Sequence, residues 1–400
     1  MATLYAIIGA GVAGSTAAQA VRETAPEGEI RVFTQEPYPF YTRIRLPELI
    51  AGRIASERLI LKGEAWFREN RIDLHLGERV TEVRKDPLTV VTSKGTYLAD
   101  RILLATGGYA FVPPLPGSDL DGVFSLRTID DALRIVQRAK GAEKAVVIGG
   151  GLLGLEAGNG LRLLGLKVGV AEVAQRLLPR QTDPQGSAIL RGIMEKMGFE
   201  FHLGAQSKEI QGEGGLARHL LLGDGRALEA DLFLISAGVR PYLDLARQLD
   251  LEIGLGIKVN DRMETSAHGI YAAGDAVEHR GVYYGIWPAA EEQGRVAGVN
   301  MASGQATYDG TVMSNKLKVA GIELVSAGEI DPEGKLESEV VSDPVNGVYR
   351  KVVYRDDRLV GCILIGDATG QKKILQAIEK KTPLGPGKGR VLRDLEAAIP

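Results

Sequence analysis

Short apolar runs that end at glycine-rich turns recur along the chain and predict buried strands that lead into helices. The run from Leu4 to Ile8 precedes Gly9-Ala-Gly11-Val-Ala-Gly14, and an alanine-rich segment follows. The run from Ala145 to Ile148 precedes Gly149-Gly-Gly151-Leu-Leu-Gly154 in the same way. Short apolar runs bounded by turns are typical of buried parallel strands. The pattern therefore predicts two strand–turn–helix units, with their glycine turns 140 residues apart.

Apolar spacing predicts further elements along the rest of the chain. Strands are expected near 29–33, 79–83, 88–92, 101–108, 230–236 and 270–275, and helices at 133–139, 154–164, 287–302 and 372–381. The segment Pro37 to Pro47 has too many prolines for a helix and predicts an active-site loop. Strands at 349–354 and 359–365 flank a turn and predict a hairpin, whereas 385–390 reads as loosely ordered.

The spacing Gly-x-Gly-x-x-Gly in both units is typical of a dinucleotide-binding turn. The first glycine permits the tight turn, the second lets the backbone approach a pyrophosphate, and the third lets the helix pack on the strand. The helix N-terminus then offers N–H groups to the phosphates. An acid ends the next strand in each unit, Glu36 in the first and Glu172 in the second, where a carboxylate can bind ribose hydroxyls. Two such units predict two dinucleotides held by one chain.

Length and composition agree with a globular protein of two or three domains, since the chain has 400 residues, 44% hydrophobic and 25% charged. The net charge of −3 gives no reason to expect nucleic acid or an anionic membrane as partner. The single cysteine, Cys362, rules out an internal disulfide and fits a reducing, cytoplasmic setting. The five histidines lack metal-ligand spacing, so no metal site is predicted. No targeting segment is recognised, because the apolar N-terminal stretch has no basic region before it.

Eight motifs in a fixed order carry a family resemblance. They are Gly9-x-Gly11-x-x-Gly14, Tyr41–Glu48, Ala105–Gly108, Gly149–Glu156, Arg176–Asp183, Ala237–Pro241, Ile270–Asp275 and Trp287–Gly294. With them the chain resembles the FAD/NAD(P)H pyridine-nucleotide oxidoreductases of the glutathione-reductase structural class. Within that class it is most similar to NADH–rubredoxin reductases and to the flavoprotein region of nitrite reductase large subunits. The resemblance covers nearly the whole chain.

The resemblance and the predicted elements together imply an α/β fold with two Rossmann-like dinucleotide-binding domains, for FAD and NAD, and a small C-terminal α+β domain. The expected boundaries are 1–117 for the first part of the FAD domain, 118–245 for the NAD(H) domain, 246–311 for the second part of the FAD domain, and 312–400 for the C-terminal domain.

The family pattern also implies which residues hold the cofactors. For FAD they are Gly9, Gly11, Val12, Ala13, Gly14, Glu36, Arg43, Arg45, Val80, Ala105, Thr106, Gly107, Gly274, Asp275 and Trp287. For NAD they are Gly149, Gly151, Leu152, Leu153, Gly154, Glu156, Glu172 and Gly238.

Specific roles follow from the same resemblance. Glu36 would bind the adenosine ribose, Arg43 would lie near the pyrophosphate, and Asp275 would bond the ribityl chain. Trp287, Glu156 and Glu48 are expected near the flavin and nicotinamide, and the helix that opens near Pro288 would aim its positive end at the flavin. No side chain is expected to act as a catalytic acid or base. Trp287 could instead be a core aromatic residue, and Arg43 a surface charge.

The chain departs from relatives in the class at two places. Oxygenase-coupled ferredoxin reductases have a lysine about where Glu48 stands, so a lysine–glutamate pair with Glu156 is not available. Disulfide reductases need a Cys-x4-Cys pair, and oxidases and peroxidases need one cysteine after Glu36, whereas this loop reads Thr42-Arg-Ile-Arg. Cys362 lies far away and is expected to be inert.

The predicted function is therefore transfer of electrons from NADH through FAD to a one-electron protein carrier such as rubredoxin or ferredoxin. NADH is expected over NADPH, because Glu172 would repel a 2′-phosphate. Two alternatives remain: a flavoprotein that reduces oxygen, a quinone or another small acceptor, and a nucleotide-sensing flavoprotein of the apoptosis-inducing type. The oligomeric state stays open.

The expected carrier is small and acidic, because basic residues gather in two parts of an otherwise slightly acidic chain. They are Arg43 and Arg45 in the first loop, and Lys372, Lys373, Lys380 and Lys381 near the C-terminus. The alternative for the lysines is a solvated helix face.

Overall fold

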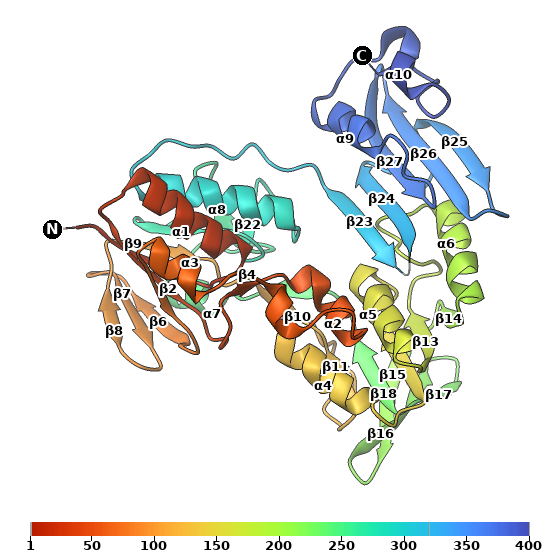
Figure 1. Cartoon of the computed structure of the whole chain (residues 1–400), viewed down its shortest axis with the longest axis horizontal. Helices are drawn as coiled ribbons and strands as arrows, with labels where there is room; N and C mark the ends of the chain where they lie inside the picture. Colours follow the sequence, from red (N-terminus) through yellow and green to blue (C-terminus); the bar gives the residue numbers. More distant parts are fainter. Residues whose placement is uncertain (1, 320, 400) are drawn as a thin grey trace. The chain divides into compact units, whose positions relative to one another are not determined.

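The computed structural model, shown in Figure 1, describes residues 2–319 and 321–399. These residues divide into two compact units. Unit 1 consists of residues 1–43, 56–109 and 239–311, and unit 2 of residues 44–55, 110–238 and 312–400, apart from the undescribed positions.

Unit 1 is built on a five-stranded parallel sheet in which the strand before the first glycine turn lies in the middle. The order is β21 (Ile270–Ala272), β9 (Arg101–Leu104), β1 (Leu4–Ile8), β2 (Glu29–Phe33) and β5 (Ile72–His75). All four pairs of neighbouring strands are parallel, so the carboxyl ends of these strands share one edge. Ligands of open α/β sheets bind outside this edge.

Two helices of unit 1, α1 (Val12–Thr24) and α8 (Trp287–Met301), pack on each other through small residues. A β-carbon added to Gly294 would lie 2.3 Å from the carbonyl oxygen of Ala13, so only glycine permits this approach. The remaining elements of unit 1 are mostly short. They are β3 (Phe40–Tyr41), η2 (Ser56–Leu59), β4 (Ile60–Lys62), α3 (Glu64–Glu69), β6 (Val80–Arg84), β7 (Thr89–Thr92), β8 (Thr96–Leu98), β10 (Gly108–Ala110, which reaches into unit 2), β19 (Val239–Pro241), α7 (Asp244–Gln248), β20 (Ile257–Val259) and β22 (Val277–His279).

Unit 2 contains a second five-stranded parallel sheet with the same plan. Its order is β11 (Val123–Ser125), β18 (Leu232–Ile235), β12 (Lys144–Ile148), β13 (Lys167–Glu172) and β14 (Phe199–Leu203). The strand before the second glycine turn, β12, again lies in the middle. The helices and the antiparallel strands that accompany it are α2 (Leu46–Ile50), α4 (Ile129–Ala139), α5 (Leu152–Leu163), α6 (Pro184–Lys196), β15 (Ser207–Glu213), β16 (Leu216–Leu222) and β17 (Ala227–Glu229).

The C-terminal part of unit 2 is an antiparallel sheet with a helix packed against it. The sheet order is β23 (Ser314–Val319), β24 (Ile322–Gly328), β27 (Arg358–Ile365), β26 (Val348–Arg355) and β25 (Glu337–Asp343). Helix α9 (Gln371–Glu379) packs on β27 and β24, and η3 (Gly385–Gly387) and α10 (Leu395–Ala398) follow. Cys362 lies in the hydrophobic core between sheet and helices.

The structure confirms the α/β fold class, the parallel sheets and the C-terminal hairpin, and it corrects two expectations. The segment 37–47 is not a loop throughout, because η1 (Arg43–Arg45) and α2 begin within it, with Pro47 in the first turn of α2. Proline is tolerated there, since that N–H has no partner within the helix. The segment 385–390 is not loose, because η3 forms there and Gly387 packs on Ala398.

No helix among the described residues is long and apolar enough to cross a membrane.

Candidate functional site

The first glycine turn has a space at its middle glycine and tight contacts at the other two. Gly9 has φ +115°, and a β-carbon there would lie 2.1 Å from the carbonyl oxygen of Ala105. At Gly14 it would lie 1.9 Å from the carbonyl oxygen of Gly9. At Gly11 it would meet nothing within 4 Å. The outer glycines are therefore required by the fold, whereas Gly11 borders open space, as a turn that approaches a ligand requires.

The second glycine turn repeats these three environments. Gly149 has φ +116°, and a β-carbon there would lie 2.3 Å from the carbonyl oxygen of Ser236. At Gly154 it would lie 2.3 Å from the oxygen of Gly149, and at Gly151 nothing lies within 4 Å. Gly11 and Gly151 are also the N-caps of α1 and α5, which have no side-chain cap and no acid in the first turn. Both helices therefore present unshielded N–H groups at an open position.

Other predicted FAD residues gather around the first turn, at the carboxyl edge of the unit 1 sheet. Ala105 donates its N–H to Ile8 and lies against Gly9, and Gly107 has φ +68° with open space beside it. Gly274 has φ +81°, and a β-carbon there would lie 2.9 Å from that of Ala13. The structure thus brings the turns after β1, β9 and β21 together. The other predicted members are Val12 in the first turn of α1, Thr106, whose hydroxyl donates to the Tyr242 carbonyl, and Val80, at the start of β6.

Asp275 follows Gly274 and lies beside the basic loop. The Gly274 N–H donates to Oε1 of Gln293 on α8 at 2.9 Å, and the Tyr283 hydroxyl donates to the Asp275 carbonyl at 3.1 Å. Both contacts fix the backbone of this turn. The pKa of Arg43 would be lowered by burial, but Tyr41, Glu36 and Asp275 outweigh burial and raise it.

Glu36 is held by side chains of the loop that follows it. Oε2 accepts from the Tyr41 hydroxyl at 2.5 Å, and Oε1 accepts from Nη2 of Arg43 at 2.5 Å. The Arg43 guanidinium also donates to the Tyr41 hydroxyl and lies 4.8 Å from the centre of its ring. Glu36 and Arg43 therefore belong to one charge-balanced cluster in unit 1. Arg45 lies outside this cluster, since it pairs with Glu48 at 2.7 Å.

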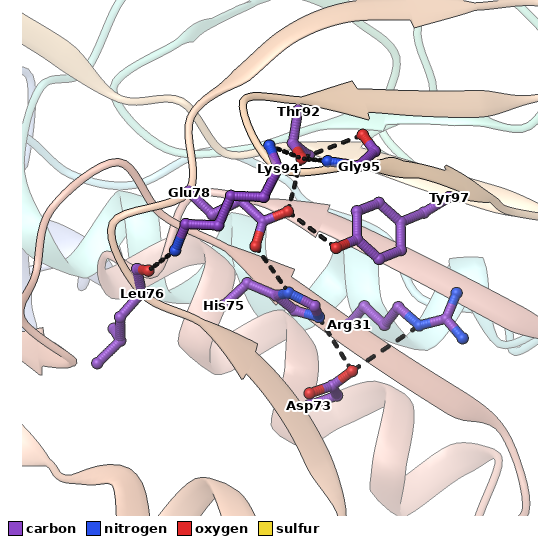
Figure 2. Close-up of polar contacts among 9 residues, drawn as sticks. All are labelled: Arg31, Asp73, His75, Leu76, Glu78, Thr92, Lys94, Gly95 and Tyr97. Atoms are coloured by element: carbon purple, nitrogen blue, oxygen red, sulfur yellow. Dashed lines mark hydrogen bonds and ion pairs between the residues drawn. The ribbon is translucent and has the colours of Figure 1, made fainter.

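A buried carboxylate, Glu78, lies at the centre of a cluster of polar contacts in unit 1 (Figure 2). Its Oε1 accepts from the hydroxyls of Thr92 at 2.6 Å and Tyr97 at 2.9 Å, and its Oε2 lies 3.0 Å from Nδ1 of His75. Burial would raise the pKa of Glu78, but these hydrogen bonds outweigh burial and lower it. Three strands, β5, β7 and β8, are joined through this one ionised side chain.

The same turn bonds directly to the segment that ends in Glu36. The Glu78 N–H donates to the Thr34 carbonyl at 2.8 Å, and the Gly77 N–H donates to the Glu36 carbonyl at 3.0 Å. Sequence reasoning missed Glu78, because two of its three side-chain partners lie 14 and 19 residues farther along the chain on other strands. Only the strand pairing brings them together.

Trp287 is the first residue of α8 and packs on the core of unit 1. Its ring centre lies 5.7 Å from that of Phe40, and it is partly buried against the surrounding apolar cluster. The helix has Pro288 in its first turn, with no side-chain cap and no acid there. Its N-terminus therefore keeps its positive end unshielded.

Glu172, at the end of β13, is 9% exposed and bonds to backbone groups on both sides. Oε2 accepts from the Gly150 N–H at 2.6 Å, and Oε1 accepts from the Ala174 N–H at 2.7 Å. This acid fixes the middle of the second glycine turn. Gly238 follows β18, has φ +103° and borders open space. Leu152 and Leu153 form the first turn of α5.

Glu48 and Glu156 lie on two helices of unit 2 that pack together. A β-carbon on Gly160 of α5 would lie 2.9 Å from the carbonyl oxygen of Pro47 on α2. Hydrogen bonds from Arg45 hold the pKa of Glu48 below its ordinary value. Glu156 is half-buried in the second turn of α5. The structure therefore places both acids on adjoining helices. Because position 48 is a glutamate, a lysine–glutamate pair with Glu156 cannot form there.

The basic and sulfur-bearing residues near the C-terminus divide into buried and exposed groups. Burial raises the pKa of the Cys362 thiol to about 12, so it stays protonated. Lys373 pairs with Glu396 at 2.9 Å, whereas Lys372, Lys380 and Lys381 are exposed. Within the described part of the chain, no three His, Cys, Asp or Glu residues form a group that could hold a metal ion.

Comparison with known proteins gives two family matches that together span most of the chain. Residues 3–306 match the family described as pyridine nucleotide-disulphide oxidoreductase, and residues 314–382 match the rubredoxin NAD+ reductase C-terminal domain. The division between them lies close to the start of the antiparallel sheet.

Relatives and solved structures agree with these matches. The chain is 36% identical to a nitrite reductase [NAD(P)H] of Bacillus subtilis over 94% of its length and 47% of that protein, and so spans about half the length of this relative. It is 29% identical to an NADH-rubredoxin oxidoreductase of Clostridium acetobutylicum over 94% of each chain. Putidaredoxin reductase, in a covalent complex with putidaredoxin, matches with a TM-score of 0.90 and 26% identity over 99% of each chain.

Proposed function

The chain belongs to the pyridine nucleotide-disulphide oxidoreductase family, and on that premise we propose that it passes electrons from NADH through FAD to a small one-electron carrier protein such as rubredoxin or ferredoxin. It is an oxidoreductase of the NAD(P)H-dependent flavoprotein type, whose cofactors are FAD and NADH. The carrier is the part that the proposal adds. The observation that supports electron transfer from NADH to FAD is the pair of glycine turns, each closed by packing at its outer glycines and open at Gly11 or Gly151.

The residues predicted to bind FAD lie in unit 1 and support this proposal. The N-terminus of α1 would bind the pyrophosphate at Gly11, with the charge of Arg43 beside it. Glu36 would accept hydrogen bonds from the adenosine ribose beside Tyr41 or Arg43, because a carboxylate accepts several hydrogen bonds. Asp275 would accept from the ribityl hydroxyls. When bound, FAD accepts a hydride from the nicotinamide and can release the electrons one at a time.

The residues predicted to bind NADH in unit 2 support the proposal in the same way. The N-terminus of α5 would bind its pyrophosphate at Gly151, and Glu172 would accept from a ribose hydroxyl while it keeps Gly150 in place. A 2′-phosphate at the same position would meet a buried carboxylate. This supports NADH over NADPH.

Electrons would leave the flavin without passing through a protein disulfide. The chain has one cysteine, and the protonated, fully buried Cys362 is unsuited to thiolate chemistry. A carrier that takes single electrons from the flavin fits this arrangement. The match of residues 314–382 to a rubredoxin reductase C-terminal domain supports the same class of acceptor.

Fewer basic residues are available to attract an acidic carrier than the sequence suggested. Arg43, Arg45 and Lys373 each have a carboxylate partner. Lys372, Lys380 and Lys381 remain exposed at the two ends of α9. We therefore place the docking charge on these three lysines.

The experiment compares acceptors at several salt concentrations. Reduction of rubredoxin should slow as ionic strength rises, because steering charges are screened beyond about 8–10 Å at physiological salt. Lys372→Glu should raise the KM for the carrier and leave flavin reduction by NADH unchanged. Lys167→Glu, an exposed lysine at the start of β13, is the control.

The results also separate the alternatives. Turnover with oxygen or a quinone as fast as with any carrier would favour a small-molecule acceptor. Slow turnover with every acceptor, with a nucleotide-dependent change in assembly, would favour a nucleotide sensor. Rates with rubredoxin that ignore salt would contradict the docking charge.

A further inference from the structure

A buried polar cluster joins the C-terminal sheet to the loop that follows Glu172 in unit 2. Oδ2 of Asp183 accepts from the Tyr349 hydroxyl at 2.5 Å and lies 3.2 Å from Nζ of Lys351. The Lys351 ammonium also donates to the Asp331 carbonyl at 2.8 Å. Tyr349 is 1% exposed, Lys351 4% and Asp183 6%, so all three are shielded from water. Burial raises the pKa of Tyr349, as does the neighbouring Asp183 carboxylate.

The partners in this cluster come from different parts of the chain. Tyr349 and Lys351 are two positions apart on β26 and therefore point to the same face of the antiparallel sheet. Asp183 is the N-cap of α6, where its Oδ1 accepts from the Gly186 N–H at 2.8 Å. A charged lysine is almost never fully buried unless it is paired, so the sheet and this helix are matched at this point.

The loop between Glu172 and Asp183 is packed against the second glycine turn. Leu177 and Leu178 are fully buried, and a β-carbon on Gly150 would lie 3.1 Å from Cδ2 of Leu177. Leu178 has φ +50°, a left-handed conformation that an ordinary residue keeps only when its surroundings enforce it. The Thr182 hydroxyl donates to the carbonyls of Leu177 at 2.8 Å and Leu178 at 3.0 Å.

The loop is thus held at both ends. Glu172 fixes its start on the glycine turn, and Asp183 fixes its end on the C-terminal sheet. Between them, Val173 is 71% exposed directly after the acid. In dinucleotide-binding domains this acid binds the ribose, so the loop begins at the nucleotide.

We infer that Tyr349 and Lys351 are positioning residues for NADH: the C-terminal domain holds the nucleotide-binding loop 173–183 in its binding conformation. The inference rests on the proposed binding of NADH at the second glycine turn. The C-terminal domain then has a part in nucleotide affinity in addition to any part in carrier docking. Loss of either side chain releases the end of the loop, so nucleotide binding weakens while the flavin site in unit 1 is unchanged.

Stopped-flow reduction of the holoenzyme by NADH tests this with Lys351→Met and Tyr349→Phe. The NADH concentration at half-maximal rate should rise roughly 2- to 30-fold, the range found for residues that couple through a packed network. The limiting rate of flavin reduction and the FAD content should stay at the wild-type values. Lys196→Met, an exposed lysine at the C-terminal end of α6, is the matched control and should change neither quantity.

The possible results test the positioning role of Tyr349 and Lys351 separately from the proposed function. Wild-type half-saturation in the Tyr349→Phe variant, which loses one hydroxyl and is the gentler change, overturns the inference. An equal loss of FAD, limiting rate and NADH affinity also overturns it, because that pattern indicates general damage. Calorimetry with NAD+ separates a failure of this inference from a failure of the proposed function. If NADH does not reduce the flavin of the wild-type protein, the proposed function is contradicted. Weaker NAD+ binding by both variants would still support the positioning role.

Discussion

Replacing Gly151 with alanine is expected to block the nucleotide and leave the fold almost unchanged. Gly151 has φ −78° and ψ 174°, which any residue adopts, and the added methyl meets no protein atom within 4 Å. Alanine is a poorer N-cap than glycine, so we expect a loss of stability below about 1 kcal/mol. The methyl occupies the space where a phosphate would approach the helix. Loss of hydrogen bonds to a charged group costs about 1.5–3 kcal/mol, roughly a ten- to hundredfold rise in the NADH concentration at half-maximal rate.

Gly154→Ala should give the opposite result. Its methyl would lie 2.3 Å from the carbonyl oxygen of Gly149 and 3.2 Å from the Ser236 side chain, and the backbone oxygen cannot move away. Overpacking of this kind costs about 1–3 kcal/mol, so the melting temperature should fall. Gly192→Ala, in α6 with open space around it, is the control and should be neutral or stabilising.

Flavin reduction in a stopped-flow instrument, FAD absorbance and thermal unfolding are measured on all three variants. A Gly151→Ala protein with wild-type half-saturation for NADH would refute the reasoning, since the open space would not be where the phosphate lies. A Gly154→Ala protein that melts with the wild type would show that the close approach of helix and strand is not required.

Three further predictions concern the carboxylates. Asp275→Ala should weaken FAD binding by about 1–3 kcal/mol through a lost acceptor, measured as release of fluorescent FAD on dilution; unchanged retention would exclude Asp275 from the site. Glu172→Ala should narrow the preference for NADH over NADPH in flavin reduction and should lower the melting temperature, because the Gly150 N–H loses its partner; an unchanged preference would show that another group selects the nucleotide. The pKa of Glu78 is lowered in the folded state, so the stability it contributes is complete above the ordinary glutamate pKa of about 4.3 and is lost as the pH falls below that value. In unfolding experiments between pH 3 and pH 7, Glu78→Gln should therefore reduce the loss of stability at low pH. An unaltered loss of stability at low pH would contradict the assignment.

The sequence was sufficient where a local rule determines the structure. A short apolar run and a glycine triplet specify strand, turn and helix within 21 residues, and both turns form as predicted. Helix α4 begins at Ile129, four residues before the predicted start, because Thr128 and Asp131 form a capping box that lies ahead of the apolar spacing. The helix at Pro47 was missed because proline content was weighed without its position in the first turn.

The sequence was insufficient where the structure depends on residues far apart in the chain. The hydrogen bond between Tyr349 and Asp183 spans 166 residues. Neither residue carries a local signal, since an aspartate before a proline predicts only a helix N-cap. That a buried lysine approaches the same aspartate follows only from how the antiparallel sheet packs on α6.

The two pseudo-repeated sheets show that equivalent positions need not have equivalent electrostatics. Glu36 lies just beyond β2, and Glu172 is the last residue of the corresponding strand β13. Glu36 is paired with the side chains of Tyr41 and Arg43, whereas Glu172 is bonded to backbone N–H groups of Gly150 and Ala174. Side-chain partners can rotate away when a ligand arrives, whereas backbone partners are fixed by the turn itself. The repeat therefore predicts where each acid lies, but its partners decide whether it can change contacts. For this reason a substitution at Glu172 should disturb the protein more than the same substitution at Glu36, even before either ligand binds.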